Sequence, residues 1–125
     1  MSQFNDTGTR MFTAGAAIKL WARVKLASGT VTEAGIADKH IGYAMQQAFA
    51  SGDIIAVRLF SKEGTHKAIA AAAITQGNEV FTAAAGKVSV SASTAFRFGV
   101  ALETATADLD IIEVLHYGMG DTAVP

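Results

Sequence analysis

The chain of 125 residues contains no cysteine, which excludes disulfide bonds and thiolate metal sites. No stretch approaches the roughly 18 uninterrupted apolar residues that a membrane-spanning helix needs. The N-terminal residues include neither a basic segment nor an apolar segment, so we expect no signal peptide. An excess of positive charge is also lacking, because the net charge is −1. This balance argues against a nucleic-acid-binding protein, which usually carries a basic excess or stripe.

Sequence motifs of catalysis are missing as well. A phosphate-binding Walker A loop built on Gly86-Lys87, the only Gly-Lys pair, needs glycine at position 81 and Ser or Thr at position 88. Phe81 and Val88 occupy these positions, so the loop is absent. No Gly-x-Ser-x-Gly nucleophile elbow occurs either. We therefore expect that the protein is not an enzyme and binds no cofactor.

The titratable residues form no recognisable site. The three histidines, His40, His66 and His116, have no metal-ligand spacing, and we interpret them as surface or rim residues. Asp53 and Asp110 are equivalent in position, and paired carboxylates can act in acid–base catalysis. However, each aspartate directly precedes a predicted strand, where its side chain typically caps a turn. The sequence therefore predicts no metal site and a structural role for both aspartates.

The chain does contain an internal similarity. Two pairs of segments match at an offset of 57 residues: Ile41–Gln46 with Phe98–Glu103, and Asp53–Val57 with Asp110–Val114. Upstream of Gly29 and Gly86 the offset is 56 residues, because the turn before Gly86 holds one extra residue. The chain therefore reads as a duplicated unit, about 12–60 and 68–117. Because the matched positions are mostly apolar residues or glycine, the duplicated unit is a scaffold rather than a catalytic site.

The duplication also predicts the domain organisation. Two copies are too few for a solenoid, which needs three or more stacked units, so we expect both halves to complete one core. We predict a single domain over residues 12–117, an N-terminal arm over residues 1–11 and a C-terminal tail over residues 118–125. Half of the residues are hydrophobic, but many are alanine, which contributes little buried area each. Such a thin core favours burial of further surface in an oligomer.

The repeated segments alternate between apolar and other residues, as half-buried β-strands do. We expect six large side chains to share the buried face and to contribute to one core: Ile41, Tyr43, Met45, Phe98, Val100 and Leu102. Gly42 and Gly99 lie within these strands, which marks a bulge or a close approach of another backbone. The sequence therefore predicts a mainly β protein, a small barrel-like or sandwich-like domain with little helix.

Two local features have alternative interpretations. Lys67–Ile74 is rich in alanine, the best helix former, but it aligns with Phe12–Ile18, which contains Gly15 and is a poor helix. We favour a strand or extended segment there, with a helix as the alternative.

Trp21, the only tryptophan, aligns with Gly77, where a turn is expected. It is either an exposed interface anchor or a local packing residue.

Several short motifs follow one another in a recognisable order. In the second copy they are Thr75–Phe81, Gly86–Val88, Phe98–Glu103 and Asp110–Val114, and in the first copy they are Val24–Leu26, Ile41–Ala44 and Gly52–Leu59. Over about residues 12–117 this order resembles the phage capsid cement (decoration) proteins, a family long catalogued only as a domain of unknown function. Two positions depart from the family pattern, since Leu109 stands where glycine is usual and Trp21 where a small turn residue is expected.

The resemblance implies a structural virion protein that binds the outer surface of an assembled phage capsid and stabilises it, commonly as a homotrimer. The implied partners are the major capsid protein and further copies of the chain, with neither nucleic acid nor membrane. The implied location is the outer capsid surface, after synthesis in the host cytoplasm. Similar proteins have also been labelled RecA/RadA-type recombinases, against which the missing Walker A loop and the balanced charge argue. The alternative function is a small ligand- or carbohydrate-binding β-module.

As candidate contacts with the capsid or with other subunits we select five residues: Phe4, Arg10, Met11, Phe12 and Trp21. The first four carry apolar and charged groups at or beyond the edge of the repeat, so the repeated core does not account for them. We expect them to form an arm that is loose in solution and orders on docking.

Overall fold

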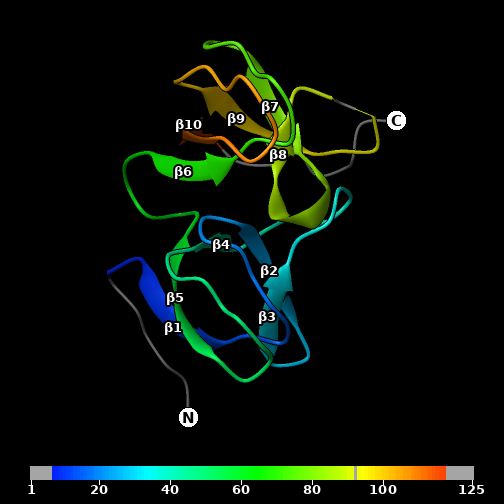
Figure 1. Ribbon diagram of the computed structural model, residues 1–125. Coiled ribbons are helices and arrows are strands. Elements are labelled where there is room, and N and C mark those ends of the chain that lie inside the picture. The colour runs from blue at the N-terminus through cyan, green and yellow to red at the C-terminus, as the bar shows by residue number, and fades with distance from the viewer. Residues whose placement is uncertain (1–6, 92, 118–125) are drawn as a thin grey trace.

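The computed structural model describes residues 7–91 and 93–117, which form two groups of β-strands (Figure 1). The first group comprises β1 (Thr9–Thr13), β2 (Arg23–Ala27), β3 (Thr30–Glu33), β4 (Gly42–Ala44) and β5 (Ile54–Leu59). The second group comprises β6 (His66–Ile69), β7 (Glu79–Thr82), β8 (Val88–Ser89), β9 (Arg97–Ala101) and β10 (Ile111–His116). A short 3-10 turn, η1 (Ala84–Gly86), precedes β8, and no helix within the described ranges has the length and apolarity to cross a membrane. The prediction of a mainly β protein with little helix is confirmed.

Each group forms one five-stranded antiparallel sheet. The strand orders are β1-β5-β4-β2-β3, in the lower part of Figure 1, and β6-β10-β9-β7-β8, in its upper part. In each sheet a parallel bridge links the two edges, joining Ala14, directly after β1, to Val31 and Ala70, directly after β6, to Val88. Each sheet is therefore curled so that its edge strands meet, which agrees with the expected barrel-like architecture.

The two sheets have the same order of equivalent strands, with β1 to β5 corresponding to β6 to β10. Irregular pairings repeat as well, because the antiparallel bridge between Ile18 and Ala48 has a counterpart between Ile74 and Ala105. The equivalent residues are again 56 or 57 positions apart, as in the sequence. The structural similarity of the sheets thus follows the sequence similarity of the two halves.

Gly42 and Gly99 mark a close approach between backbones, as predicted. A Cβ atom on Gly42 would overlap the carbonyl oxygen of Arg58, and one on Gly99 would overlap the carbonyl oxygen of Leu115. Both contacts lie between paired strands, β4 with β5 and β9 with β10. Glycine at these positions therefore lets the central strands of each sheet pair at short distance.

The core consists of two clusters, one in each sheet, so the expectation of one shared core is wrong. Each half nevertheless supplies one residue to the other, since Tyr43 belongs to the cluster of the second sheet and Ile69 to that of the first. Of the six side chains expected to be buried, Tyr43 and Phe98 are fully buried. The other four are only partly buried: Ile41, Met45, Val100 and Leu102.

The reason for this difference is the small interior of each curled sheet. Alanines fill much of it: Ala14, Ala22, Ala44 and Ala48 in the first cluster, and Ala68, Ala70, Ala101 and Ala105 in the second. Ala44 and Ala101 alternate along their strands with the six residues expected in the core, and both are buried. Because a tightly curled sheet leaves little room for large inward-facing side chains, Tyr43 is instead placed between the two sheets. The alanine-rich composition is thereby explained.

The segment Lys67–Ile74 is extended, and the helix alternative is wrong. Its first residues complete β6, and Ile74 forms a bridge with Ala105. Residues 9–11, which we assigned to an arm, belong to β1 and pair with β5. The chain is therefore part of the sheet from Thr9 onward. The remainder of the proposed arm before Thr7, and the proposed tail over residues 118–125, lie outside the described residues.

Candidate functional site: the joint and the groove between the sheets

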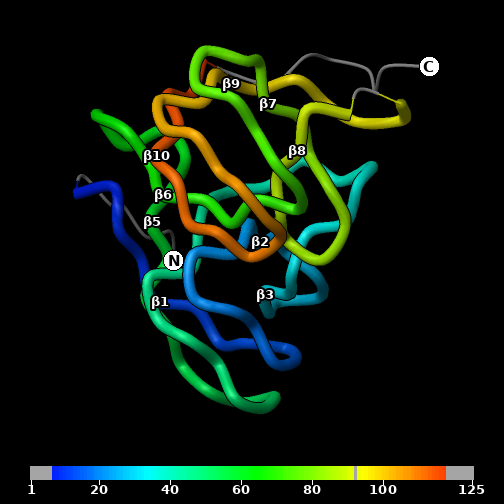
Figure 2. The backbone as a smooth tube through the Cα atoms, turned by 45° about the horizontal axis from the view of Figure 1, so that its top comes forward, coloured from blue at the N-terminus to red at the C-terminus, as the bar shows by residue number. Residues whose placement is uncertain are grey.

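Arg23, the first residue of β2, holds the two sheets together. Its side chain is fully buried, and its guanidinium donates hydrogen bonds to five backbone carbonyl oxygens. Three acceptors lie in the loop after β3 (Ala34, Gly35 and Asp38), and two lie on either side of η1 in the second sheet (Ala83 and Lys87). We call this contact region the joint. In Figure 2 the cyan loop after β3 lies beside the yellow-green segment that leads into β8.

Backbone and side-chain contacts around Arg23 extend the joint. The amide of Gly86 donates to the carbonyl oxygen of Ala34 at 2.8 Å, and the hydroxyl of Thr82 donates to the carbonyl oxygen of Ile36 at 2.5 Å. Burial lowers the pKa of the Arg23 guanidinium to about 10, so it stays charged at neutral pH. The carbonyl dipoles around the guanidinium stabilise this charge, which is otherwise costly to bury.

All three histidines meet beside the joint, and the interpretation of His40 and His66 as surface or rim residues is wrong. Both are buried, while His116 is partly buried. The Nε2 atom of His40 lies 3.1 Å from the hydroxyl of Tyr43 and 3.1 Å from Nε2 of His116. The ring of Phe98 packs edge-on against His40, with 4.8 Å between the ring centroids. Residues from both halves thus form one aromatic cluster, which sequence spacing does not indicate.

Hydrogen bonds from arginine determine the tautomer of the two buried histidines, His40 and His66. Nε of Arg58 donates to Nδ1 of His66 at 3.1 Å, and Nη1 of Arg23 lies 3.4 Å from Nδ1 of His40. Because arginine only donates, each Nδ1 accepts and the ring proton is on Nε2. Burial first, and then the nearby arginine, lowers the pKa of both His40 and His66. Burial likewise lowers the pKa of His116 to about 4. All three rings are therefore uncharged at neutral pH.

Within residues 7–91 and 93–117, no three histidine, cysteine or acidic side chains are placed to hold a metal ion. Asp53 accepts hydrogen bonds from the amides of Phe49 and Ala50, and Asp110 accepts equivalent ones from Thr106 and Ala107. The hydrogen bonds from Thr106 and Ala107 lower the pKa of Asp110. The predicted turn-capping role of both aspartates is confirmed.

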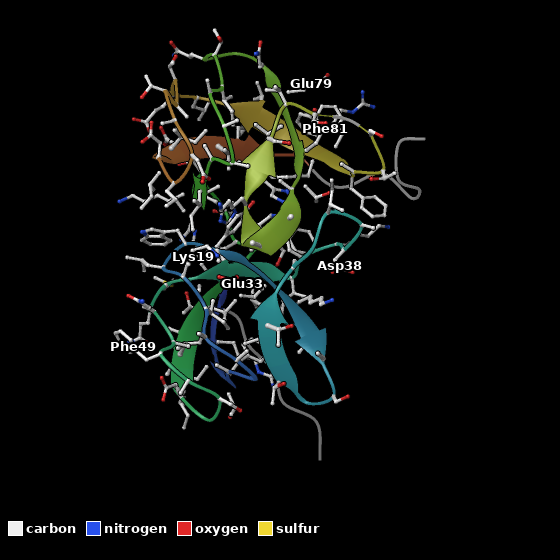
Figure 3. All side chains as sticks on the ribbon, turned by 45° about the vertical axis from the view of Figure 1, so that its right-hand side comes forward. Lys19, Glu33, Asp38, Phe49, Glu79 and Phe81 are labelled. Atoms are coloured by element: carbon white, nitrogen blue, oxygen red, sulfur yellow. The ribbon has the colours of Figure 1, made fainter. Side chains whose placement is uncertain are left out.

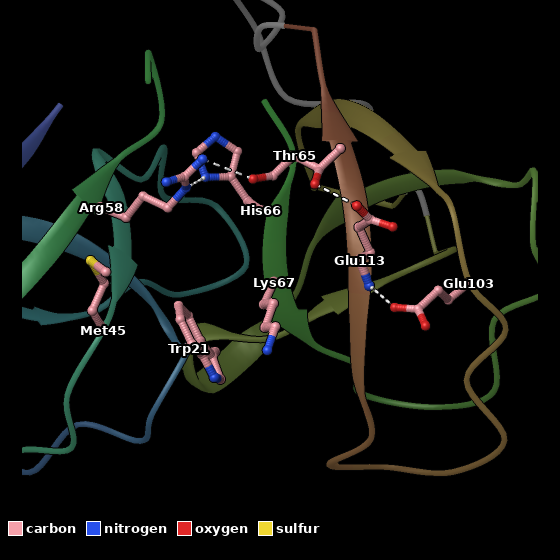
Figure 4. Close-up of a pocket in the computed structure, with 8 residues that line it drawn as sticks. All are labelled: Trp21, Met45, Arg58, Thr65, His66, Lys67, Glu103 and Glu113. Carbon is pink, nitrogen blue, oxygen red and sulfur yellow. Dashed lines mark hydrogen bonds between the residues drawn. The ribbon is translucent and has the colours of Figure 1, made fainter. Parts of the chain in front are cut away.

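A groove of about 380 Å³ opens between the sheets where β5 and β6 face each other (Figure 4). Its walls carry Trp21, Met45 and Arg58 from the first half, and Thr65, His66, Lys67, Glu103 and Glu113 from the second. Trp21 is partly buried against the core of the first sheet, and the ammonium of Lys67 lies 5.3 Å from the centroid of its ring. The tryptophan therefore has a local packing contact and also faces the groove.

The two turns at which the sequence departs from the family pattern keep the geometry of glycine. Trp21 has φ of 69°, like Gly77 with 93°, and Leu109 has φ of 74°, like Gly52 with 98°. Bulky residues rarely adopt this left-handed conformation, which costs roughly 1–2 kcal/mol relative to glycine. The aligned turns are therefore conserved in shape between the two halves although their residues differ.

The four predicted contact residues that the structure describes do not form one site. Phe4 lies outside the described residues. Arg10, Met11 and Phe12 lie next to one another on β1, where Phe12 packs against the first core and the Arg10 guanidinium lies 4.8 Å from the Phe12 ring centroid. Met11 is 55% exposed on this edge strand. Trp21 lies in the groove instead.

Arg23 was missed in the sequence because its role is not repeated. The equivalent position in the second half is Glu79, a residue of different charge that is exposed. The one sequence signal is that Arg23 stands between Ala22 and Val24, where two apolar residues flank a charge at the start of a strand. A charged residue in such a place is a candidate for a buried, hydrogen-bonded role.

Comparison with known proteins agrees with the fold. The crystal structure of the head fiber gp8.5 N base in bacteriophage phi29 is similar to this chain, with a TM-score of 0.71 and 14% sequence identity. The similarity covers 94% of this chain and 97% of that chain. At this identity the likeness shows a shared fold. No curated protein matches the chain.

The sequence itself matches a family model in its second half. The model describes the phage cement proteins, and it matches residues 61–116, which include all five strands of the second sheet. The motifs singled out in that half lie within the matched region. The resemblance recognised in the sequence is thus confirmed, because residues 61–116 match the model of the phage cement proteins.

Proposed function

We propose that this protein is a structural component of a phage virion that binds the outer surface of the assembled capsid and stabilises the shell. The match of residues 61–116 to the phage cement proteins carries this proposal. The similarity in fold to a head fiber base, over nearly the whole of both chains, supports it. The protein acts by contact, not by catalysis, and its partners are the major capsid protein and further copies of itself. It is made in the host cytoplasm and takes no part in nucleic-acid binding.

The outward-facing side of β1 and β5 is the proposed capsid contact. Met11 pairs with Ala56 and Thr13 with Ile54, so these four side chains share one face of the sheet. Met11 is 55% and Ile54 65% exposed, and none of the four is charged. We call this surface the outer β1–β5 face. Phe49, labelled in Figure 3, projects from the neighbouring loop and is 76% exposed. Exposed apolar side chains grouped in this way typically mark an interaction site.

Association into a homotrimer would multiply such contacts. Each contact with the shell can be weak, because linked binding sites act at a high effective concentration once the first is engaged. Residues before β1 supply the arm, which continues directly from the strand that carries Met11. The arm and the outer β1–β5 face therefore form one continuous contact surface in this proposal.

The test is binding to capsids assembled without the protein. Purified wild-type chain should decorate these capsids and raise the temperature at which they release DNA. The double variant Met11→Lys/Ile54→Lys places two charges on the outer β1–β5 face and should reduce decoration at least tenfold. Leu26→Lys is the matched control, since Leu26 is 56% exposed on β2, and it should bind as the wild type does.

Each outcome decides between the parts of the proposal. Failure of the wild-type chain to bind or stabilise capsids refutes the cement function. Normal decoration by the double variant refutes the outer β1–β5 face while leaving the function in place. The mass of the protein by light scattering, free and on the particle, tests the homotrimer.

A further inference from the structure

The groove between the sheets has hydrogen-bonding capacity that the fold does not use. Glu103 accepts the amide of Glu113 through Oε1 only, and Glu113 accepts the hydroxyl of Thr65 through Oε2 only. Figure 4 shows these bonds on one wall and Trp21 beside Lys67 below them. The second oxygen of each carboxylate has no hydrogen-bond partner among the described residues. Two acceptors on this wall are therefore available to a ligand.

Donors are available in the same groove. Arg58 donates through Nε and Nη2 to His66, Glu63 and Thr65, and its Nη1 makes no hydrogen bond with residues 7–91 and 93–117. Lys67 pairs with Glu113 across the β6–β10 ladder, yet its ammonium lies over the Trp21 ring and forms no salt bridge within those ranges. The indole N–H of Trp21 likewise has no hydrogen-bond partner there. Donors and acceptors thus face one cavity.

The two halves of the chain show that the scaffold does not need these residues. At the equivalent positions of the other half, Trp21 is replaced by Gly77, Lys67 by Met11, Glu103 by Gln46, Glu113 by Ala56 and Arg58 by Leu115. Gln46 makes the same hydrogen bond to the strand as Glu103, accepting the amide of Ala56 at 2.8 Å. The fold is therefore built equally well without an indole, an ammonium or free carboxylates at these places. We infer that these groove residues serve to bind a ligand.

The backbone at Trp21 supports the same conclusion. Its left-handed conformation suits glycine, which occupies the equivalent turn as Gly77. A tryptophan held in such a conformation is strained, and strained residues cluster at functional sites. In this strained conformation the indole ring of Trp21 lines the groove.

We propose that the groove binds a pyranose unit of a neutral saccharide. The apolar C–H face of the sugar ring packs against the indole of Trp21, as aromatic side chains accommodate apolar surface while keeping a polar edge. Hydroxyl groups both donate and accept, so they pair with the carboxylates of Glu103 and Glu113 and with the guanidinium of Arg58. Two acidic and two basic side chains balance in the groove, which disfavours a polyanion. Its volume of about 380 Å³ lies in the usual range for small-molecule sites, roughly 300–1,000 Å³.

The experiment uses the full chain and a panel of immobilised glycans, followed by titration with the methyl glycosides of the sugars that bind. Binding should quench the fluorescence of Trp21, the only tryptophan of the chain. Trp21→Gly installs the residue of the equivalent turn, so it should still fold, and its binding to the immobilised glycans should be at least tenfold weaker than that of the wild type. Glu103→Gln keeps the hydrogen bond to the strand, as Gln46 does, and should weaken binding by a similar factor. Leu109→Gly is the matched control. It relieves the same kind of backbone strain at a turn outside the groove, so it should not change the affinity for the glycan.

Several results overturn the proposal. Absence of binding to any glycan of the panel refutes it, as does equal binding by the wild type and Trp21→Gly. Preference for a zwitterionic amino acid or a peptide over the glycosides refutes the ligand class. Because capsid decoration is assayed separately with the outer β1–β5 face variants, failure here leaves the proposed cement function untouched, and the saccharide site survives failure of that function.

Discussion

The Nε2 atoms of His40, from the first half of the chain, and His116, from the second half, lie 3.1 Å apart beside the joint. Their neighbours are aromatic rings, Arg23 and the third histidine, and Arg58 lies at the far side of His66. Burial and the nearby arginine disfavour a charged imidazole at both His40 and His66. Protonation of the three histidines should therefore weaken the contact between the two sheets.

We expect the protein to lose stability as the pH falls from about 6.5 toward 4. The pKa of each histidine is lowered in the folded state, His116 to about 4, so the unfolded chain binds more protons in this window. One pKa unit corresponds to about 1.4 kcal/mol, and we expect a loss of roughly 1–3 kcal/mol between pH 7 and pH 4.5. Urea unfolding at several pH values measures it. His116→Gln should reduce the slope, and an unchanged midpoint from pH 7 to pH 4.5 would contradict the prediction. The lowered pKa values of Asp38 and Asp110 act only below about pH 4.

Replacing Arg23 should destabilise the whole protein. Arg23→Met removes the guanidinium donor from five carbonyl oxygens of both sheets, two of them in buried hydrogen bonds, and we expect a loss of roughly 3–5 kcal/mol in the free energy of unfolding. Arg97→Ala is the control, because this exposed arginine forms a 3.4 Å surface salt bridge with Glu79, and its removal should cost less than about 0.5 kcal/mol. Urea denaturation compares the two. Equal stability of the two variants would show that Arg23 does not hold the joint.

Truncation of Phe98 should be costly although the ring is only one of several aromatic side chains. Phe98→Ala removes a fully buried ring that packs on His40 and His116, and we expect a loss of roughly 3–5 kcal/mol. Phe49→Ala removes the same number of atoms from a side chain that is 76% exposed and should be nearly neutral. Thermal and urea unfolding distinguish these results. A small effect at Phe98 would mean that the joint repacks.

The turn at Leu109 should become more stable with glycine. Leu109 has φ of 74° and is 56% exposed, so Leu109→Gly relieves backbone strain with little loss of packing. We expect a gain of up to about 1 kcal/mol, limited by the greater freedom of glycine in the unfolded chain. The reverse change at the equivalent turn, Gly52→Leu, should cost about 1 kcal/mol or more. The interpretation of the two turns as equivalent fails if both changes have the same sign.

Two deletions separate the arm from the sheet. Removing residues 2–6 should leave the unfolding midpoint unchanged and weaken capsid binding, because these residues precede β1. Removing residues 2–11 also deletes the pairing of Thr9, Arg10 and Met11 with β5, so it should lower stability as well. Capsid co-sedimentation and urea unfolding give both readouts. Undiminished binding of the shorter deletion would exclude an arm.

Properties that depend on neighbouring residues could be predicted from the sequence. Alternating side chains predicted the strands, Asp53 and Asp110 predicted their own turns, and Gly42 and Gly99 predicted close backbone contacts. Each of these depends on local geometry, in which a side chain acts on its own strand or turn. The family resemblance follows from the same short motifs and their spacing.

The way in which the two halves meet depends on contacts between residues that are far apart in the chain. Arg23 binds the carbonyl oxygen of Lys87, and His40 contacts His116, across 64 and 76 positions of the chain. These partners have no counterpart in the repeat, since the surfaces that two copies press together are not equivalent. Because the interior of each curled sheet is small, Tyr43 packs in the core cluster of the second sheet and not in that of its own sheet. Burial of polar side chains there depends on partners that only folding brings together, and no local pattern indicates them.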